Sequence, residues 1–159
     1  MWDAYKKGYR AWLQLEKSLS EHSVAAYLTD LDKLTQFLEL ENITASPDKI
    51  TLQHLQKFTA WIHELGMGAT SQARIISGIR SFFGYCVAEQ LVESDPTELL
   101  EAPKTRRKLP DTLSIEEIDS IIAAIDLSTP EGTRNKAIVE TMYSCGLRVS
   151  ELVNLKISQ

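Results

Sequence analysis

The chain has 159 residues, a net charge of −5 and 25% charged residues, a composition typical of a globular protein. No apolar run approaches the roughly 18 residues that a transmembrane helix needs, and the N-terminus lacks the apolar stretch of a secretory signal. These properties exclude membrane and secreted classes, and we expect a cytoplasmic protein.

Residues 1–103 are predicted to form a bundle of four or five amphipathic helices. Apolar side chains recur at a spacing of three to four residues, and strand signals are nearly absent. Ser20 and Thr51 can cap the second and third helices, and Gly66 can end the third. A short fifth helix is predicted after Asp95–Pro96. The four main helices are expected near residues 2–17, 20–41, 51–65 and 69–89.

Residues 104–112 are predicted to be a basic linker between two domains. Pro103 and Pro110 bracket the segment KTRRK, which holds four basic residues and no acidic one. Residues 1–103 carry 9 basic and 14 acidic residues, and residues 111–159 carry 4 and 8. A solvated linker and a polyanion contact explain this run equally well. The cations are Lys104, Arg106, Arg107 and Lys108.

Residues 113–159 are predicted to form only the first helices of a second domain. Ser114 and Glu117 have the spacing of a capping box, and Pro130 can open the next helix. Gly146 is expected to end that helix, and the final VNLKISQ has the pattern of a segment leading into a strand. About 50 residues rarely close a core alone. We therefore expect the chain to stop inside this domain.

No metal or cofactor site is expected. Cys86 and Cys145 lie in apolar helical patterns without the spacing of metal ligands, and both are predicted to be small buried thiols. The histidines, His22, His54 and His63, are scattered over helices. The sequence has no glycine-rich phosphate loop, paired-carboxylate site or nucleophile–base motif.

The fourth predicted helix has a polar face opposite its apolar stripe. A helical wheel places Thr70, Arg74, Ser77, Ser81 and Tyr85 within about 80° of one another, with Gly78 on the same side and Arg80 beside it. Small hydroxyl side chains beside an arginine allow close approach to a phosphate backbone. A solvated helix face is the alternative, although this face carries neither Lys nor Glu. The stripe is Ile75, Ile76, Ile79, Phe82, Phe83, Cys86 and Val87.

The segment SCGLRVSEL, residues 144–152, places Arg148 at the junction of two predicted helices. An ion pair with Glu151 or Glu140 is the simpler interpretation, and the residues by themselves favour it. Alternatively, a guanidinium aimed at a phosphate would stabilise developing negative charge through paired hydrogen bonds.

Four segments, in chain order, resemble tyrosine site-specific recombinases and phage-type integrases, especially the Xer recombinases that resolve chromosome dimers. MYSCGLRVSEL, residues 142–152, resembles the first catalytic-arginine motif of the family. TSQARIISGIRSFF (70–83) and SEHSVAAYLTDLDKLTQFL (20–38) are similar to the two DNA-facing helices of its core-binding domain. DPTELLEAPKTRRKLPDTLSIEEI (95–118) resembles its interdomain connector and first catalytic-domain helix.

The resemblance implies a SAM-like integrase N-terminal domain and the start of a catalytic domain. It implies a parent protein that cuts and rejoins double-stranded DNA through a 3′-phosphotyrosine intermediate, without metal or nucleotide, as a tetramer on paired sites. Arg148 would hold the scissile phosphate, and Glu151 would orient Arg148. The implied DNA contacts are Thr70, Ser71, Arg74, Ser77 and Arg80 of the fourth helix, and Lys104, Arg106, Arg107 and Lys108 of the linker.

The family's lysine, His-x-x-Arg motif and tyrosine nucleophile all follow the first arginine. None of them follows Arg148 here, and the tyrosines at positions 5, 9, 27, 85 and 143 all precede it. We therefore expect this chain to be inactive alone and to belong to a nucleoid-associated parent acting in DNA integration, chromosome partition or cell division. A naturally short, non-catalytic DNA-binding or regulatory protein remains an alternative. A helical protein-interaction module is another, since the net charge is negative.

Overall fold

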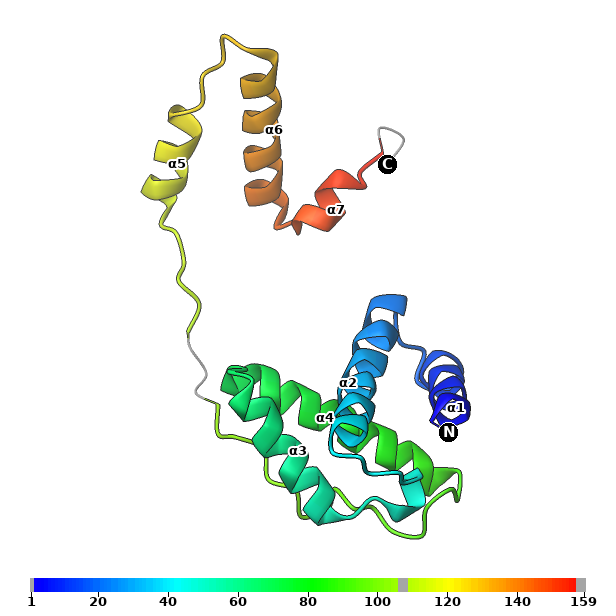
Figure 1. Cartoon of the computed structure of the whole chain (residues 1–159). Helices are drawn as coiled ribbons and strands as arrows, with labels where there is room; N and C mark the ends of the chain where they lie inside the picture. Colours follow the sequence, from blue (N-terminus) through cyan, green and yellow to red (C-terminus); the bar gives the residue numbers. More distant parts are fainter. Residues whose placement is uncertain (1, 106–108, 157–159) are drawn as a thin grey trace. The chain divides into compact units, whose positions relative to one another are not determined.

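The computed structural model describes residues 2–105 and 109–156, and every regular element in them is helical (Figure 1). The prediction of an all-α fold is confirmed, with seven α-helices and no strand in those ranges. The chain divides into two units, residues 1–107 and 108–159. The division falls inside the predicted linker. No helix among the described residues is long and apolar enough to cross a membrane.

Unit 1 holds the four main helices of the predicted bundle. Ser20 accepts a hydrogen bond from the Ser23 N–H at 3.3 Å, which confirms it as the cap of the second helix. Thr51 caps the third helix, and the His54 ring accepts a hydrogen bond from the Thr51 N–H at 3.2 Å. The helices are α1 (Asp3–Leu15), α2 (Glu21–Leu40), α3 (Leu52–Glu64) and α4 (Ala69–Ala88), with a 3₁₀ turn at Pro47–Lys49.

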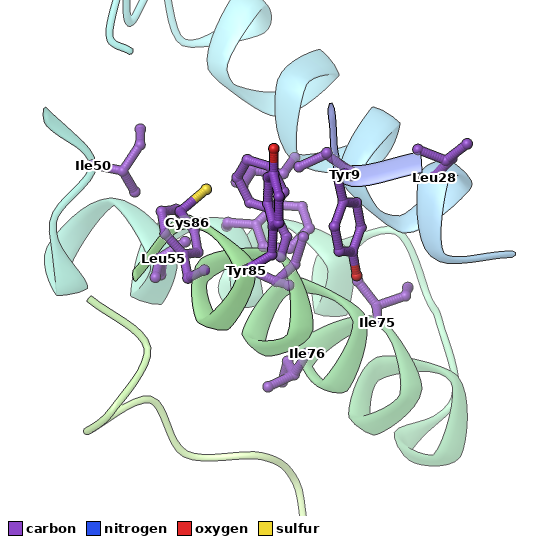
Figure 2. Close-up of a cluster of buried hydrophobic side chains, with 14 of the residues drawn as sticks. Tyr9, Leu28, Ile50, Leu55, Ile75, Ile76, Tyr85 and Cys86 are labelled. Carbon is purple, nitrogen blue, oxygen red and sulfur yellow. The ribbon is translucent and has the colours of Figure 1, made fainter. Parts of the chain in front are cut away.

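Helix α4 lies at the centre of unit 1, because α1, α2 and α3 all pack against it. Its predicted apolar stripe is buried except for Val87, which is 39% exposed. Figure 2 shows Ile75, Ile76, Tyr85 and Cys86 of α4 in the core with residues of α1, α2 and α3. Each fully buried aliphatic or aromatic side chain stabilises the fold by about 1.5–3 kcal/mol. The bundle therefore has a core of its own.

Aromatic contacts join α1 to α4. The Tyr9 ring meets Phe82 edge-to-face, with ring centroids 5.3 Å apart, and lies 5.5 Å from Tyr85. The Trp2 indole N–H donates to the Ala45 carbonyl at 3.0 Å, which ties the start of α1 to the loop after α2. These contacts fix α1 across the side of α4 that carries Tyr85.

The fifth helix predicted after Asp95–Pro96 does not form, and a turn takes its place. The Asp95 carboxylate accepts hydrogen bonds from the Thr97 N–H and hydroxyl at 2.7 and 2.6 Å, which closes the turn locally. The chain then buries Leu100 in the core, and the Arg80 guanidinium donates to the Leu100 carbonyl. Leu100 directly follows this turn, and its N–H donates to the Thr97 carbonyl at 3.0 Å, so the leucine reaches the core without a further helix.

Unit 2 holds α5 (Ile115–Ala123), α6 (Pro130–Cys145) and the short α7 (Val149–Val153). The capping box predicted for α5 is confirmed, since Ser114 and Glu117 bond each other's backbone N–H at 3.2 and 2.8 Å. Pro130 is the first residue of α6, and Gly146 ends that helix in the left-handed region at φ +64°. Residues 154–156 form no strand, and the rest of the predicted strand lead-in lies outside the described residues.

Unit 2 buries little apolar surface. Among its described residues only Gly132 is buried. Cys86 is buried, and burial raises the pKa of its thiol to about 12. Cys145, the last residue of α6, is exposed, so the prediction that both thiols are buried is wrong for Cys145. The physical reason is that the described residues of unit 2 do not cover this part of α6. Exposed apolar side chains include Leu113, Ile115, Ile121, Leu127, Tyr143, Val149, Val153 and Leu155.

This difference predicts unequal protection from hydrogen exchange. Amides of α5, α6 and α7 should exchange faster than those of α2 and α4, because few buried contacts oppose local opening in unit 2. Exchange measured by mass spectrometry on a dilute monomer checks this. Protection of α5–α7 equal to that of α4 would show that unit 2 is self-sufficient, contrary to this expectation.

Candidate nucleic-acid interface

The polar face predicted on α4 is exposed only in its N-terminal part. Thr70, Ser71, Arg74 and Ser77 are exposed. The face prediction is wrong for Gly78 and Tyr85, which are buried, and Ser81 is half-buried. The physical reason is packing: α2 contacts α4 at Gly78, and α1 contacts it at Tyr85. The exposed strip is therefore about two helical turns long.

Arg74 forms a two-pronged ion pair with Asp30 of α2. Its Nη1 donates to Oδ2 at 2.8 Å, and its Nη2 donates to Oδ1 at 2.7 Å. The Asp30 side chain is only 1% exposed, whereas that of Arg74 is 52% exposed. Burial raises the pKa of Asp30, while the bonds from Arg74 and the charge of Lys33 act in the opposite direction. The guanidinium of the surface residue Arg74 thus stabilises the buried carboxylate of Asp30.

Gly78 makes this arrangement possible. A Cβ at position 78 would lie 2.5 Å from Oδ2 of Asp30 and 3.1 Å from its Cγ. Any larger residue would push the carboxylate away from α4, one helical turn from Arg74. The glycine is therefore needed for close contact between two helices, and its backbone conformation is ordinary.

A pocket of about 230 Å³ lies between α2 and α4 above this pair. Ser23, Ser77 and Tyr27 are among the residues that line it, and Arg74 is the one long charged side chain among the described residues of its lining. Small side chains leave room for a flat or branched polar group to reach the guanidinium. The lining residues are Ser23, Ala26, Tyr27, Asp30, Arg74 and Ser77.

The remaining predicted DNA contacts are more scattered. Arg80 is exposed, but its guanidinium donates to the Leu100 carbonyl, so it also anchors the segment before the linker. Lys104 is exposed. Arg106, Arg107 and Lys108 lie outside the described residues.

In unit 2, Arg148 precedes the first turn of α7, directly after the turn at Gly146. Glu151 Oε1 accepts a hydrogen bond from the Arg148 guanidinium at 3.0 Å, and its Oε2 accepts one from the Arg148 N–H at 2.8 Å. The Arg148 side chain is 82% exposed. The predicted pairing with Glu151 is therefore present, and it leaves guanidinium N–H groups facing solvent.

Asp30 is a site residue that the sequence patterns did not single out. It lies three residues after Tyr27 and four before the buried Leu34, so it occupies a core-facing position of α2. An acid at such a position needs a partner. That spacing was an available signal, although it does not identify Arg74, 44 residues away, as the partner.

Residues 7–90 match the family described as phage integrase, N-terminal SAM-like domain, and residues 111–159 match the phage integrase family. The tyrosine recombinase XerD of Staphylococcus saprophyticus is 39% identical over 155 residues, covering 98% of this chain and 52% of that protein. XerD of Oceanobacillus iheyensis is 37% identical, covering 92% and 49%. The crystal structure of XerA recombinase superposes with a TM-score of 0.49 at 27% identity, covering 98% of this chain and 50% of the other.

The Asp30–Gly78 contact predicts opposite effects of two alanine substitutions in α4. Gly78→Ala should destabilise unit 1 by about 1–3 kcal/mol, because the new methyl group overlaps the buried carboxylate. Gly84→Ala should be neutral or stabilising by up to about 1 kcal/mol, because nothing lies within 4 Å of its Cβ position and alanine favours the helix. Urea unfolding followed by circular dichroism measures both, and equal effects would contradict the close contact.

Proposed function

The chain belongs to the phage integrase family, and we propose that it binds double-stranded DNA as part of a tyrosine site-specific recombinase. The observation that carries this proposal is the order of the two family matches. The first covers the helices that present the Arg74 strip, and the second covers the unit that holds Arg148. The matches to both halves favour this proposal over a stand-alone regulatory or protein-interaction module.

We propose that the two units have different roles, DNA binding in unit 1 and contact with the scissile phosphate in unit 2. In unit 1 the exposed residues of α4 and the pocket beside α2 contact the duplex, and Arg80 and Lys104 extend this contact toward the linker. The basic residues Arg106, Arg107 and Lys108 neutralise phosphates where the linker meets DNA. Because unit 1 carries more acidic than basic residues, specific geometry rather than overall charge has to direct binding.

In unit 2 we assign Arg148 to the scissile phosphate. Its guanidinium would donate to a non-bridging oxygen and stabilise the negative charge that develops when the phosphodiester is attacked. Glu151 holds one amino group and the backbone N–H of Arg148, which fixes the direction of the side chain. Glu151 therefore acts as a positioning residue, and Arg148 supplies the electrostatic stabilisation.

The chain spans about half the length of the curated relatives it matches. We propose that the intact protein cuts and rejoins DNA through a 3′-phosphotyrosine, using a tyrosine outside this sequence. Tyr9 and Tyr85 are unsuited to that role, because both are buried and burial raises the pKa of each phenol. We further propose that four copies act on two paired sites in the nucleoid, since strand exchange joins two duplexes.

DNA binding without chemistry is the expected behaviour of this chain. It should shift a duplex in a gel. For each neutralised phosphate, the logarithm of the binding constant should fall by roughly 0.9 for every tenfold rise in salt concentration. Incubated with a nicked duplex that traps covalent intermediates, it should give no adduct that survives detergent. The absence of any salt-dependent shift would contradict the proposal that the chain binds DNA. A covalent adduct would show that a tyrosine of this chain is the nucleophile.

Arg148→Lys should separate chemistry from stability. The Arg148–Glu151 pair is exposed, so its loss should change the free energy of unfolding by only about 0–1 kcal/mol. In the intact recombinase the same change should slow recombination by roughly 100- to 1000-fold, because lysine keeps the charge but loses the forked donor geometry. Arg134→Lys on α6 is the matched control. A normal recombination rate with a large loss of stability would make Arg148 a structural residue.

A further inference from the structure

Asp30 holds Arg74 in a way that leaves one edge of the guanidinium free. The carboxylate takes one N–H from each of the two amino groups. A guanidinium has five N–H groups, and the Nε–H and the second Nη2–H point the same way as a parallel pair. Within the described part of the chain, this second pair donates to no acceptor. Arg74 can therefore hold Asp30 and a second two-point acceptor together.

The charge of the pair favours a neutral acceptor. Asp30 lies directly against the guanidinium, so the two charges largely cancel, and an approaching phosphate would also meet the repulsion of the carboxylate. A neutral acceptor with two atoms in a plane avoids this repulsion. In the major groove, guanine offers such a pair in O6 and N7, which arginine binds through two parallel hydrogen bonds.

The surroundings of Arg74 fit a base edge. The residues that line the pocket between α2 and α4 include three with small side chains, Ser23, Ala26 and Ser77. Because Asp30 is buried against α4 at Gly78 and accepts two hydrogen bonds from Arg74, the guanidinium is held before any ligand arrives. A donor pair fixed in advance loses little conformational entropy on binding.

We propose that Arg74 is a specificity-determining residue that binds one guanine in the major groove, and that Asp30 is the residue that positions it. This inference rests on the proposed function, since it needs the α2–α4 face to lie against DNA. Arg74 then contributes base preference at one position rather than general affinity for phosphate.

The test is selection of bound duplexes from a pool with a randomised central segment, using the full chain. The wild type should enrich guanine at one position, with a preference of roughly 5- to 150-fold over other bases. Arg74→Lys should lose that preference, because lysine keeps the charge but lacks the planar fork. Asp30→Asn should lose it too, because one carboxylate oxygen becomes a donor. Arg10→Lys, on an exposed arginine of α1, should keep it.

Circular dichroism and melting curves confirm that each variant is folded. If Asp30→Asn unfolds, Asp30→Glu replaces it, since it keeps the charge but moves the carboxylate. Salt dependence gives a second readout: Asp30→Asn frees the charge of Arg74, so binding should become more sensitive to salt, by up to about one unit of slope. A residue with only a structural role would not increase that slope.

Three outcomes overturn the inference while leaving DNA binding intact. If Arg74→Lys keeps the wild-type guanine preference and only lowers the affinity for all sequences equally, Arg74 is a phosphate contact and the inference fails. Retention of the preference in the Asp30 variant would remove Asp30 from the positioning role. If the wild-type chain binds DNA without any base preference, Arg74 does not bind a guanine. A wild type that binds no duplex would instead overturn the proposed function.

Discussion

The α2–α4 side of unit 1 depends on one close contact, in which the Asp30 carboxylate lies against α4 at Gly78. Because the position has no Cβ, α2 can approach α4 closely enough to bury a charged group between them. That burial is tolerable only because Arg74 reaches the carboxylate from the surface with two hydrogen bonds. The same pair fixes Arg74, which lines the pocket between the two helices. Packing and the proposed recognition therefore share the same three residues.

The two units differ in what their residues are arranged to do. Unit 1 surrounds α4 with three helices and holds a continuous apolar core, so its surface side chains are carried on a rigid support. Unit 2 leaves many apolar side chains exposed and places Arg148 beside Glu151 at a helix start. We propose that unit 1 contributes binding and specificity, and that unit 2 contributes one charged group for phosphoryl transfer.

Local signals in the sequence predicted most of the fold. Ser20, Thr51, Ser114 and Gly146 act as the caps that their residue types indicate, because these contacts involve neighbours within a few positions. The errors in unit 1 arose where distant segments meet. Tyr85 is polar at one atom but packs its ring on α1, and the segment after Asp95 is shaped by burial of Leu100. The partner of Asp30 lies 44 residues away, and helical periodicity carries no information about it.

In the proposed function, DNA contacts unit 1 through the α2–α4 face. The most direct measurement is nuclear magnetic resonance mapping of backbone amides while a mixed-sequence duplex is added to the labelled chain. We expect the largest shifts at Ser23, Tyr27, Ser71, Arg74 and Ser77, with little change on the exposed face of α3. Shifts centred on α3, with the α2–α4 pocket unaffected, would contradict it.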